Sequence, residues 1–89
     1  VQIEPSDGYI MDSLGWAYFL VNDIDKSVYF LEKAVSLIPD DATLNDHLGD
    51  AYWKAGRKNE ALSQWKRVLL LDPNFKEKFK ISRKIKEGF

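Results

Sequence analysis

Apolar side chains follow a helical spacing along most of the chain. The first two runs consist of Leu14, Ala17, Tyr18 and Val21, and then of Val28, Leu31, Ala34, Val35 and Ile38. The next two consist of Leu48, Ala51, Tyr52 and Ala55, and then of Leu62, Trp65, Val68 and Leu69. Steps of three and four residues place such side chains on one stripe of a helix. The pattern predicts four helices in two pairs, and the short joint within each pair makes its helices antiparallel.

The two pairs repeat one another at an interval of 34 residues. Pro5, Pro39 and Pro73 are spaced by this interval, and the dipeptide Leu14-Gly15 recurs as Leu48-Gly49. A fixed period between about 20 and 50 residues indicates a repeat array. Glycine inside a helix costs about 1 kcal/mol relative to alanine, so glycines at equivalent points suggest close contact between the paired helices.

Turn and cap residues stand at the expected joints. Asn22 and Gly56 follow the first helix of each pair, and both residue types tolerate the left-handed conformation that ends a helix. Each proline falls where we expect a helix to stop. The expected N-caps are Asp7 and Asp41 for the first helices, and Asp25 and Asn59 or their near neighbours for the second helices.

The repeated residues resemble the tetratricopeptide repeat, whose pattern is W-x2-L-G-x2-Y, A-x3-F and then P at period 34. The first copy reads Met11-x2-Leu14-Gly15-x2-Tyr18, Ser27-x3-Leu31-x2-Ala34 and Pro39. The second reads Asn45-x2-Leu48-Gly49-x2-Tyr52, Ala61-x3-Trp65-x2-Val68 and Pro73. Met11 and Asn45 replace the family's tryptophan, and Ser27 replaces a small alanine. The resemblance implies an all-α fold, a right-handed solenoid of antiparallel helix-turn-helix repeats.

The resemblance also divides the chain. Residues 1–7 are expected to be the tail of a preceding repeat, 8–41 the first repeat and 42–75 the second. Residues 76–89 depart from the pattern, but an apolar stripe of Phe75, Phe79, Ile81 and Ile85 predicts a helix that caps the solenoid. We expect a piece of a longer array. Residues 12–17 and 45–53 further resemble the last repeats of long bacterial family members, which suggests a soluble protein of the bacterial cytoplasm or periplasm.

The composition excludes several classes of protein. The chain has no cysteine and one histidine, His47, so we expect no thiolate site, no metal site and no cofactor. His47 has Asp46 and Asp50 nearby, but the chain has no nucleophile elbow or glycine-rich phosphate loop, so we expect no enzyme. The longest apolar run, Trp16 to Val21, is far shorter than the roughly 20 residues of a membrane span.

Charge is distributed unevenly. Residues 1–53 hold two basic and ten acidic side chains, whereas residues 54–89 hold eleven basic and four acidic ones. Opposite charge at the two ends favours head-to-tail stacking of copies, so a self-assembly module that joins end to end or pairwise is the alternative function. The basic side chains near the C-terminus are better explained by a solvated cap than by binding to nucleic acid or a membrane.

The resemblance also implies a binding surface, because the first helix of each repeat lines the concave groove of the family's solenoid. From the first repeat these residues are Tyr9, Asp12, Ser13, Trp16, Phe19 and Leu20. From the second they are Thr43, Asp46, His47, Asp50, Trp53 and Lys54. Aromatic side chains beside acidic ones suit a peptide or protein segment with apolar and basic character. For Trp16 and Trp53, ligand contact and structural packing remain open alternatives.

Overall fold

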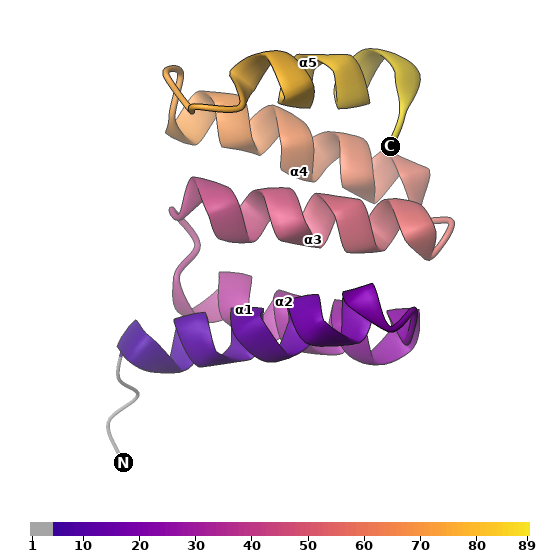
Figure 1. Ribbon diagram of the computed structural model, residues 1–89. Helices are drawn as coiled ribbons and strands as arrows, with labels where there is room; N and C mark the ends of the chain where they lie inside the picture. Colours follow the sequence, from indigo (N-terminus) through magenta and orange to yellow (C-terminus); the bar gives the residue numbers. More distant parts are fainter. Residues whose placement is uncertain (1–4) are drawn as a thin grey trace.

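The computed structural model describes residues 5–89, which form five helices and, within that range, no strand. The helices are α1 (Pro5–Leu20), α2 (Ile24–Leu37), α3 (Ala42–Lys54), α4 (Lys58–Leu71) and α5 (Lys78–Glu87). Each helix packs mainly on its neighbours in sequence, so the helices form a stack from α1 and α2 to α5 (Figure 1). The predicted all-α architecture of antiparallel helix pairs is confirmed.

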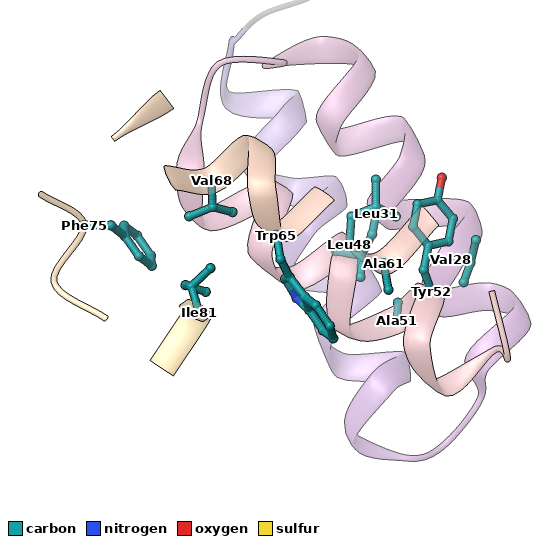
Figure 2. Close-up of a cluster of buried hydrophobic side chains, with 10 residues drawn as sticks. All are labelled: Val28, Leu31, Leu48, Ala51, Tyr52, Ala61, Trp65, Val68, Phe75 and Ile81. Atoms are coloured by element: carbon teal, nitrogen blue, oxygen red, sulfur yellow. The ribbon is translucent and has the colours of Figure 1, made fainter. Parts of the chain in front are cut away.

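The core lies between the helix pairs and draws one side chain or more from each helix after α1. Leu31 of α2, Trp65 of α4 and Ile81 of α5 are fully buried (Figure 2). Leu31 and Trp65 are 34 residues apart and therefore hold equivalent places in the two repeats. The larger indole in the second repeat reaches both α3 and α5, so it joins the last helix to the core.

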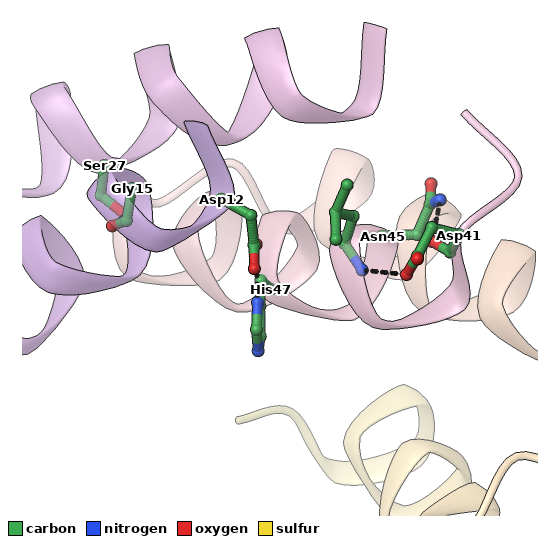
Figure 3. Close-up of polar contacts among 7 residues, drawn as sticks. Asp12, Gly15, Ser27, Asp41, Asn45 and His47 are labelled. Carbon is green, nitrogen blue, oxygen red and sulfur yellow. Dashed lines mark hydrogen bonds and ion pairs between the residues drawn. The ribbon is translucent and has the colours of Figure 1, made fainter. Parts of the chain in front are cut away.

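The two repeated glycines allow the close helix contact that their spacing predicts. A Cβ atom on Gly15 would lie 2.6 Å from Cγ of Leu31, and a Cβ on Gly49 would lie 2.5 Å from Nε1 of Trp65. Both distances are too short for real atoms, so a larger residue would push the paired helices apart. In the first repeat, the buried Ser27 hydroxyl donates a hydrogen bond of 2.8 Å to the carbonyl oxygen of Gly15 (Figure 3).

The turns inside the two helix pairs are closed in the same way. Asn22 has a φ of 63° and Gly56 a φ of 79°, as predicted for left-handed helix ends. The next amide along the chain then donates back to the helix, from Asp23 to the Tyr18 carbonyl and from Arg57 to the Tyr52 carbonyl, both at 2.9 Å. The second turn thus repeats the first in both conformation and hydrogen bonding.

The predicted N-cap residues are confirmed in part. Asp41 caps α3 as expected, since its side chain accepts a bond of 3.1 Å from the Leu44 amide. Asp23, a near neighbour of Asp25, caps α2. The prediction for Asn59 is wrong, because α4 already begins at Lys58 and its N-cap residue, Arg57, makes no side-chain cap bond.

The start of the first helix also differs from the expectation. α1 begins at Pro5, so Asp7 lies within its first turn and is not the N-cap. Proline suits this place because the first turn of a helix needs no amide hydrogen bond. The expected tail of a preceding repeat, residues 1–7, therefore contributes its last three residues to α1, and its first four lie outside the described residues.

The predicted capping helix exists, but its buried face is only partly as expected. Phe75 and Ile81 are buried, whereas Phe79 is 80% exposed. Two helical positions separate Phe79 from Ile81, so the two side chains point to nearly opposite sides of α5. Lys84, three positions after Ile81, takes the place beside it on the buried face, and the expectation of a fully solvated basic cap is wrong for this residue.

We predict that Gly49→Ala lowers the free energy of unfolding by about 1–2 kcal/mol. Overpacking costs about 1–3 kcal/mol, and the 2.5 Å approach to the fully buried Trp65 ring places this case at about 2–3 kcal/mol, which outweighs the gain of about 1 kcal/mol in helix propensity. Denaturant unfolding followed by circular dichroism measures the difference. Ser63→Ala on the exposed face of α4 is the control and should be neutral or slightly stabilising. Equal stability of Gly49→Ala and the parent protein would contradict the close contact.

Candidate functional site

The helices α1, α3 and α5 contribute the side chains of one polar and aromatic surface. Residues 16, 50 and 84 are spaced by the repeat period and hold equivalent positions on these three helices. Trp16, Asp50 and Lys84 line the same pocket of about 330 Å³, which we call the α1/α5 pocket. Its other lining residues are Lys80, Arg83, Gly88 and Phe89. The pocket is therefore lined by α1, α3 and α5 together with the two residues that follow α5.

An aromatic stack crosses from α1 to α3 beside this pocket. The Trp16 ring lies parallel to Phe19 at 4.5 Å between centroids, and the His47 ring stacks on Trp16 at 4.3 Å. Phe89 meets the edge of Phe19 at 6.0 Å and extends the cluster toward α5. Trp16 is partly exposed and lies outside the hydrophobic core cluster. A partly exposed indole in a rigid stack offers a large, preorganised contact surface.

His47 is oriented by Asp12. Its Nδ1 donates to Oδ1 of Asp12 across 2.7 Å, joining α3 to α1 (Figure 3). Burial alone would lower the pKa of His47, but the hydrogen bond and the charge of Asp12, with further charge from Asp46 and Asp50, raise it above its ordinary value of 6.5. The imidazolium form therefore persists to higher pH in the folded protein, and the Asp12 carboxylate is occupied by it.

A second ionic group is buried between α3 and α5. The Nζ of Lys84 donates to Oδ1 of Asp46 at 3.0 Å and to Oδ1 of Asp50 at 2.9 Å. The indole N–H of Trp65 donates to the same Asp50 oxygen at 3.1 Å. We call these four residues the Lys84 cluster. All of them are buried, so each charged atom depends on its partners within the cluster.

The Lys84 cluster holds two carboxylates and one ammonium group. Burial, followed by the nearby Asp46 carboxylate, raises the pKa of Asp50 to about 6, while the bonds from Lys84 and Trp65 oppose this rise. For Lys84, burial lowers the pKa, but the two carboxylates outweigh it and hold the pKa above its ordinary value. At neutral pH the cluster keeps its ammonium group and retains a partial excess of negative charge.

The structure brings together six of the predicted groove residues. They are Asp12, Trp16, Phe19, Asp46, His47 and Asp50. Lys84 was not predicted as part of this surface, although it lies 34 residues after Asp50 and could have been found from that spacing.

The remaining predicted residues lie away from the Lys84 cluster. Tyr9 donates a hydrogen bond of 3.1 Å to Asp41, and with Ser13 it lines a separate apolar hollow. Trp53 packs on Trp65 at 5.7 Å between ring centroids, which favours structural packing among its two alternatives. The last three of the predicted set, Leu20, Thr43 and Lys54, are exposed near helix ends. Their part in binding stays a prediction.

Among residues 5–89, no group of three or more histidine, aspartate and glutamate side chains is placed to hold a metal ion. None of the helices from α1 to α5 is long and apolar enough to cross a membrane. The carboxylates of the site are bound to His47 or Lys84, whereas Trp16, Phe89 and the exposed Lys80 and Arg83 line the open part of the pocket.

Comparison with known proteins finds two family matches and two relatives. Tetratricopeptide repeat models match residues 9–41 and 42–75. An Arabidopsis thaliana protein, the chloroplastic tetratricopeptide repeat domain-containing protein PYG7, is 39% identical over 75% of this chain. The peroxisomal targeting signal receptor of Candida albicans is 30% identical over 78% of it. The matched part spans 22% and 12% of these relatives, and neither is bacterial, so the expected bacterial origin finds no support.

We predict that Lys84→Met lowers the free energy of unfolding by about 3–5 kcal/mol, because it leaves two buried carboxylates without their cation. The triple variant Lys84→Met, Asp46→Asn, Asp50→Asn should recover most of this loss, since it removes the charges together. Thermal and denaturant unfolding measure both. A single variant within about 1 kcal/mol of the parent protein would show that the Lys84 cluster is solvated.

We predict that the protein is more stable at about pH 6 than at about pH 8 because of His47. A pKa raised by folding contributes stability that is complete below the ordinary value of 6.5 and is lost as the pH rises through the folded value. Unfolding at a series of pH values measures this slope. His47→Gln keeps a hydrogen-bond donor toward Asp12 but cannot titrate, so it should reduce the slope to the part that comes from Asp50, whose pKa is raised to about 6. An unchanged slope in that variant would assign the effect to another group.

Proposed function

The chain belongs to the tetratricopeptide repeat family, and we propose that it is a non-catalytic module that binds a peptide or protein segment on its α1, α3 and α5 surface. Repeats of this family generally mediate interactions between proteins. The Candida albicans relative is named as a receptor for a targeting signal, which is consistent with recognition of a protein segment.

The observation that carries the proposal is the aromatic stack beside the α1/α5 pocket. Trp16 is partly exposed, is held by stacking contacts with Phe19 and His47, and forms part of the pocket wall. Tryptophan in such a place is typical of the few residues that dominate binding energy at interfaces. The pocket itself admits one or two side chains of a ligand, since it is open and has a volume of about 330 Å³.

The residues of the surface divide into contact and positioning roles. We assign direct ligand contact to Trp16 and Phe19, whose rings supply apolar area. Asp12 positions the His47 ring under Trp16, and Asp50 holds Lys84 at the pocket wall. The apolar character expected of the ligand is supported by these rings. The basic character loses its main support, because the nearby carboxylates already hold cations.

We predict that Trp16→Ala weakens binding of a peptide by about 30-fold, the effect of removing an aromatic anchor worth about 2 kcal/mol. Peptides selected from a displayed random library are the probes, and isothermal titration calorimetry measures their affinity. Helical circular dichroism should be retained, because Trp16 is outside the core cluster.

The control for this experiment is Tyr29→Ala, an exposed aromatic residue on α2, outside the proposed surface. It should leave affinity unchanged. Equal binding by Trp16→Ala and the parent protein would remove the proposed site, and collapse of helicity would show that Trp16 is a core residue.

A second candidate function is self-assembly, which one observation favours. Ile10 and Leu14 on α1 are 53% and 40% exposed, whereas their equivalents Leu44 and Leu48 on α3 are each 2% exposed, in the α3 face that packs on α2. The face of α1 thus has the apolar character of a helix interface but carries no helix within the described residues. We propose that a second copy covers it, by end-to-end or pairwise contact.

We predict that copies associate through this face. Light scattering at low salt should show a mass that rises with protein concentration, and Leu14→Glu should keep the protein monomeric because it places a charge in the contact. Asp25→Lys, an exposed change on α2, is the control for altered charge. A monomer at every concentration would exclude self-assembly and leave the peptide-binding proposal intact.

A further inference from the structure

We infer that the α1/α5 pocket recognises an acidic side chain of a peptide or protein segment, next to an apolar side chain that contacts Trp16. The inference rests on the proposed peptide-binding function and adds the charge of the ligand. It reverses the basic ligand that the sequence suggests. The observations behind it are the pairing of the carboxylates, the exposed cations Lys80 and Arg83 of α5, and the aromatic rings beside these groups.

Each carboxylate of this surface is already paired with a cation from within the protein, although Asp46 and Asp50 share one. Asp12 holds His47 at 2.7 Å, while Asp46 and Asp50 hold Lys84 at 3.0 and 2.9 Å. The side chains of the two lysine-bound aspartates are 8% and 5% exposed, so a ligand cation has little access to them. A basic ligand side chain would have to displace Lys84 from a desolvated position, which is unfavourable.

The cations at the rim of the pocket are, in contrast, available. Lys80 lies one helical turn before Lys84, so both side chains share one face of α5, and Lys80 lines the α1/α5 pocket. It is exposed, and no carboxylate of residues 7–89 lies within ion-pair distance of it. Arg83 also lines the pocket, and its contact to Glu87 is long, 3.9 Å, and highly exposed. Such an exposed pair contributes little and is easily exchanged for a ligand carboxylate.

Apolar surface adjoins these cations. Trp16 forms one part of the pocket wall and the half-exposed Phe89 another, with Phe19 joining the two rings. A guanidinium group can bind a carboxylate through two parallel hydrogen bonds, and a nearby ammonium adds a point charge. The pocket therefore matches a segment in which an aspartate or glutamate is next to an aromatic or aliphatic residue.

The test is selection from a displayed library of random peptides, followed by calorimetry on the selected peptides and on versions with glutamate replaced by glutamine or lysine. We expect acidic residues to be enriched beside apolar ones. Affinity should fall about fivefold with glutamine and further with lysine, and it should weaken as salt screens the charges.

Two matched variants separate a local contact from overall charge. Lys80→Gln with Arg83→Gln should lower affinity for the acidic peptides about fivefold and abolish the difference between glutamate and glutamine. Lys76→Gln with Lys86→Gln removes the same charge from exposed positions outside the pocket. It should leave unchanged both the affinity for the acidic peptides and the difference between glutamate and glutamine versions.

Each outcome decides between the two proposals. Selected peptides without acidic residues, or equal affinity for glutamate, glutamine and lysine versions, would overturn the inference while the peptide-binding function stands. Equal losses in the two double variants would overturn it in the same way, because charge alone would then explain the preference. If no peptide is enriched over a surface without the protein, both the inference and the peptide-binding function are excluded.

Discussion

The contact of Trp65 with Gly49 connects the core of the protein to its binding surface. The absence of a side chain at Gly49 lets the buried indole approach α3, and the indole N–H then reaches Asp50. Asp50 in turn holds Lys84, which fixes α5 to α3. A change in how α3 and α4 pack would therefore move the carboxylate that anchors the last helix. The position of one pocket wall depends on packing inside the preceding repeat.

Most of the fold could be predicted from the sequence, because it depends on residue spacing. The helical spacing of the apolar residues, with Gly15 and Gly49 at equivalent positions, predicts the helix pairs. The left-handed turns follow from Asn22 and Gly56. The cap at Asp41 was predictable for the same reason. The cap of α4 was not, since Arg57 holds the N-cap position without a side-chain bond and no sequence pattern identifies such an end.

The site was less predictable, because a sequence shows which side chains are charged but not which of them form ion pairs. The sequence places Asp46, Asp50 and His47 on one surface with Trp16, and in the structure the rings of Trp16 and His47 stack. The sequence predicts a solvated Lys84 because the repeat motif is lost in the last helix, although the 34-residue spacing continues through this residue and the side chain is buried. Once Lys84 is buried between Asp46 and Asp50, the carboxylates that the sequence places on this surface are paired within the protein and less accessible to a ligand. Local packing, not composition, therefore sets the charge of the surface.

The α1/α5 pocket has walls from the two ends of the described stack, and α5 is held in place mainly through α3 and α4. A terminal helix of this kind can detach in a local opening that leaves the rest folded. A ligand that contacts α5 and Trp16 together would suppress that opening. By thermodynamic linkage, a change that favours detachment of α5 would lower the affinity for this ligand. Amide hydrogen exchange along α5 would therefore slow when a ligand is bound, even though α5 forms only one part of the binding surface.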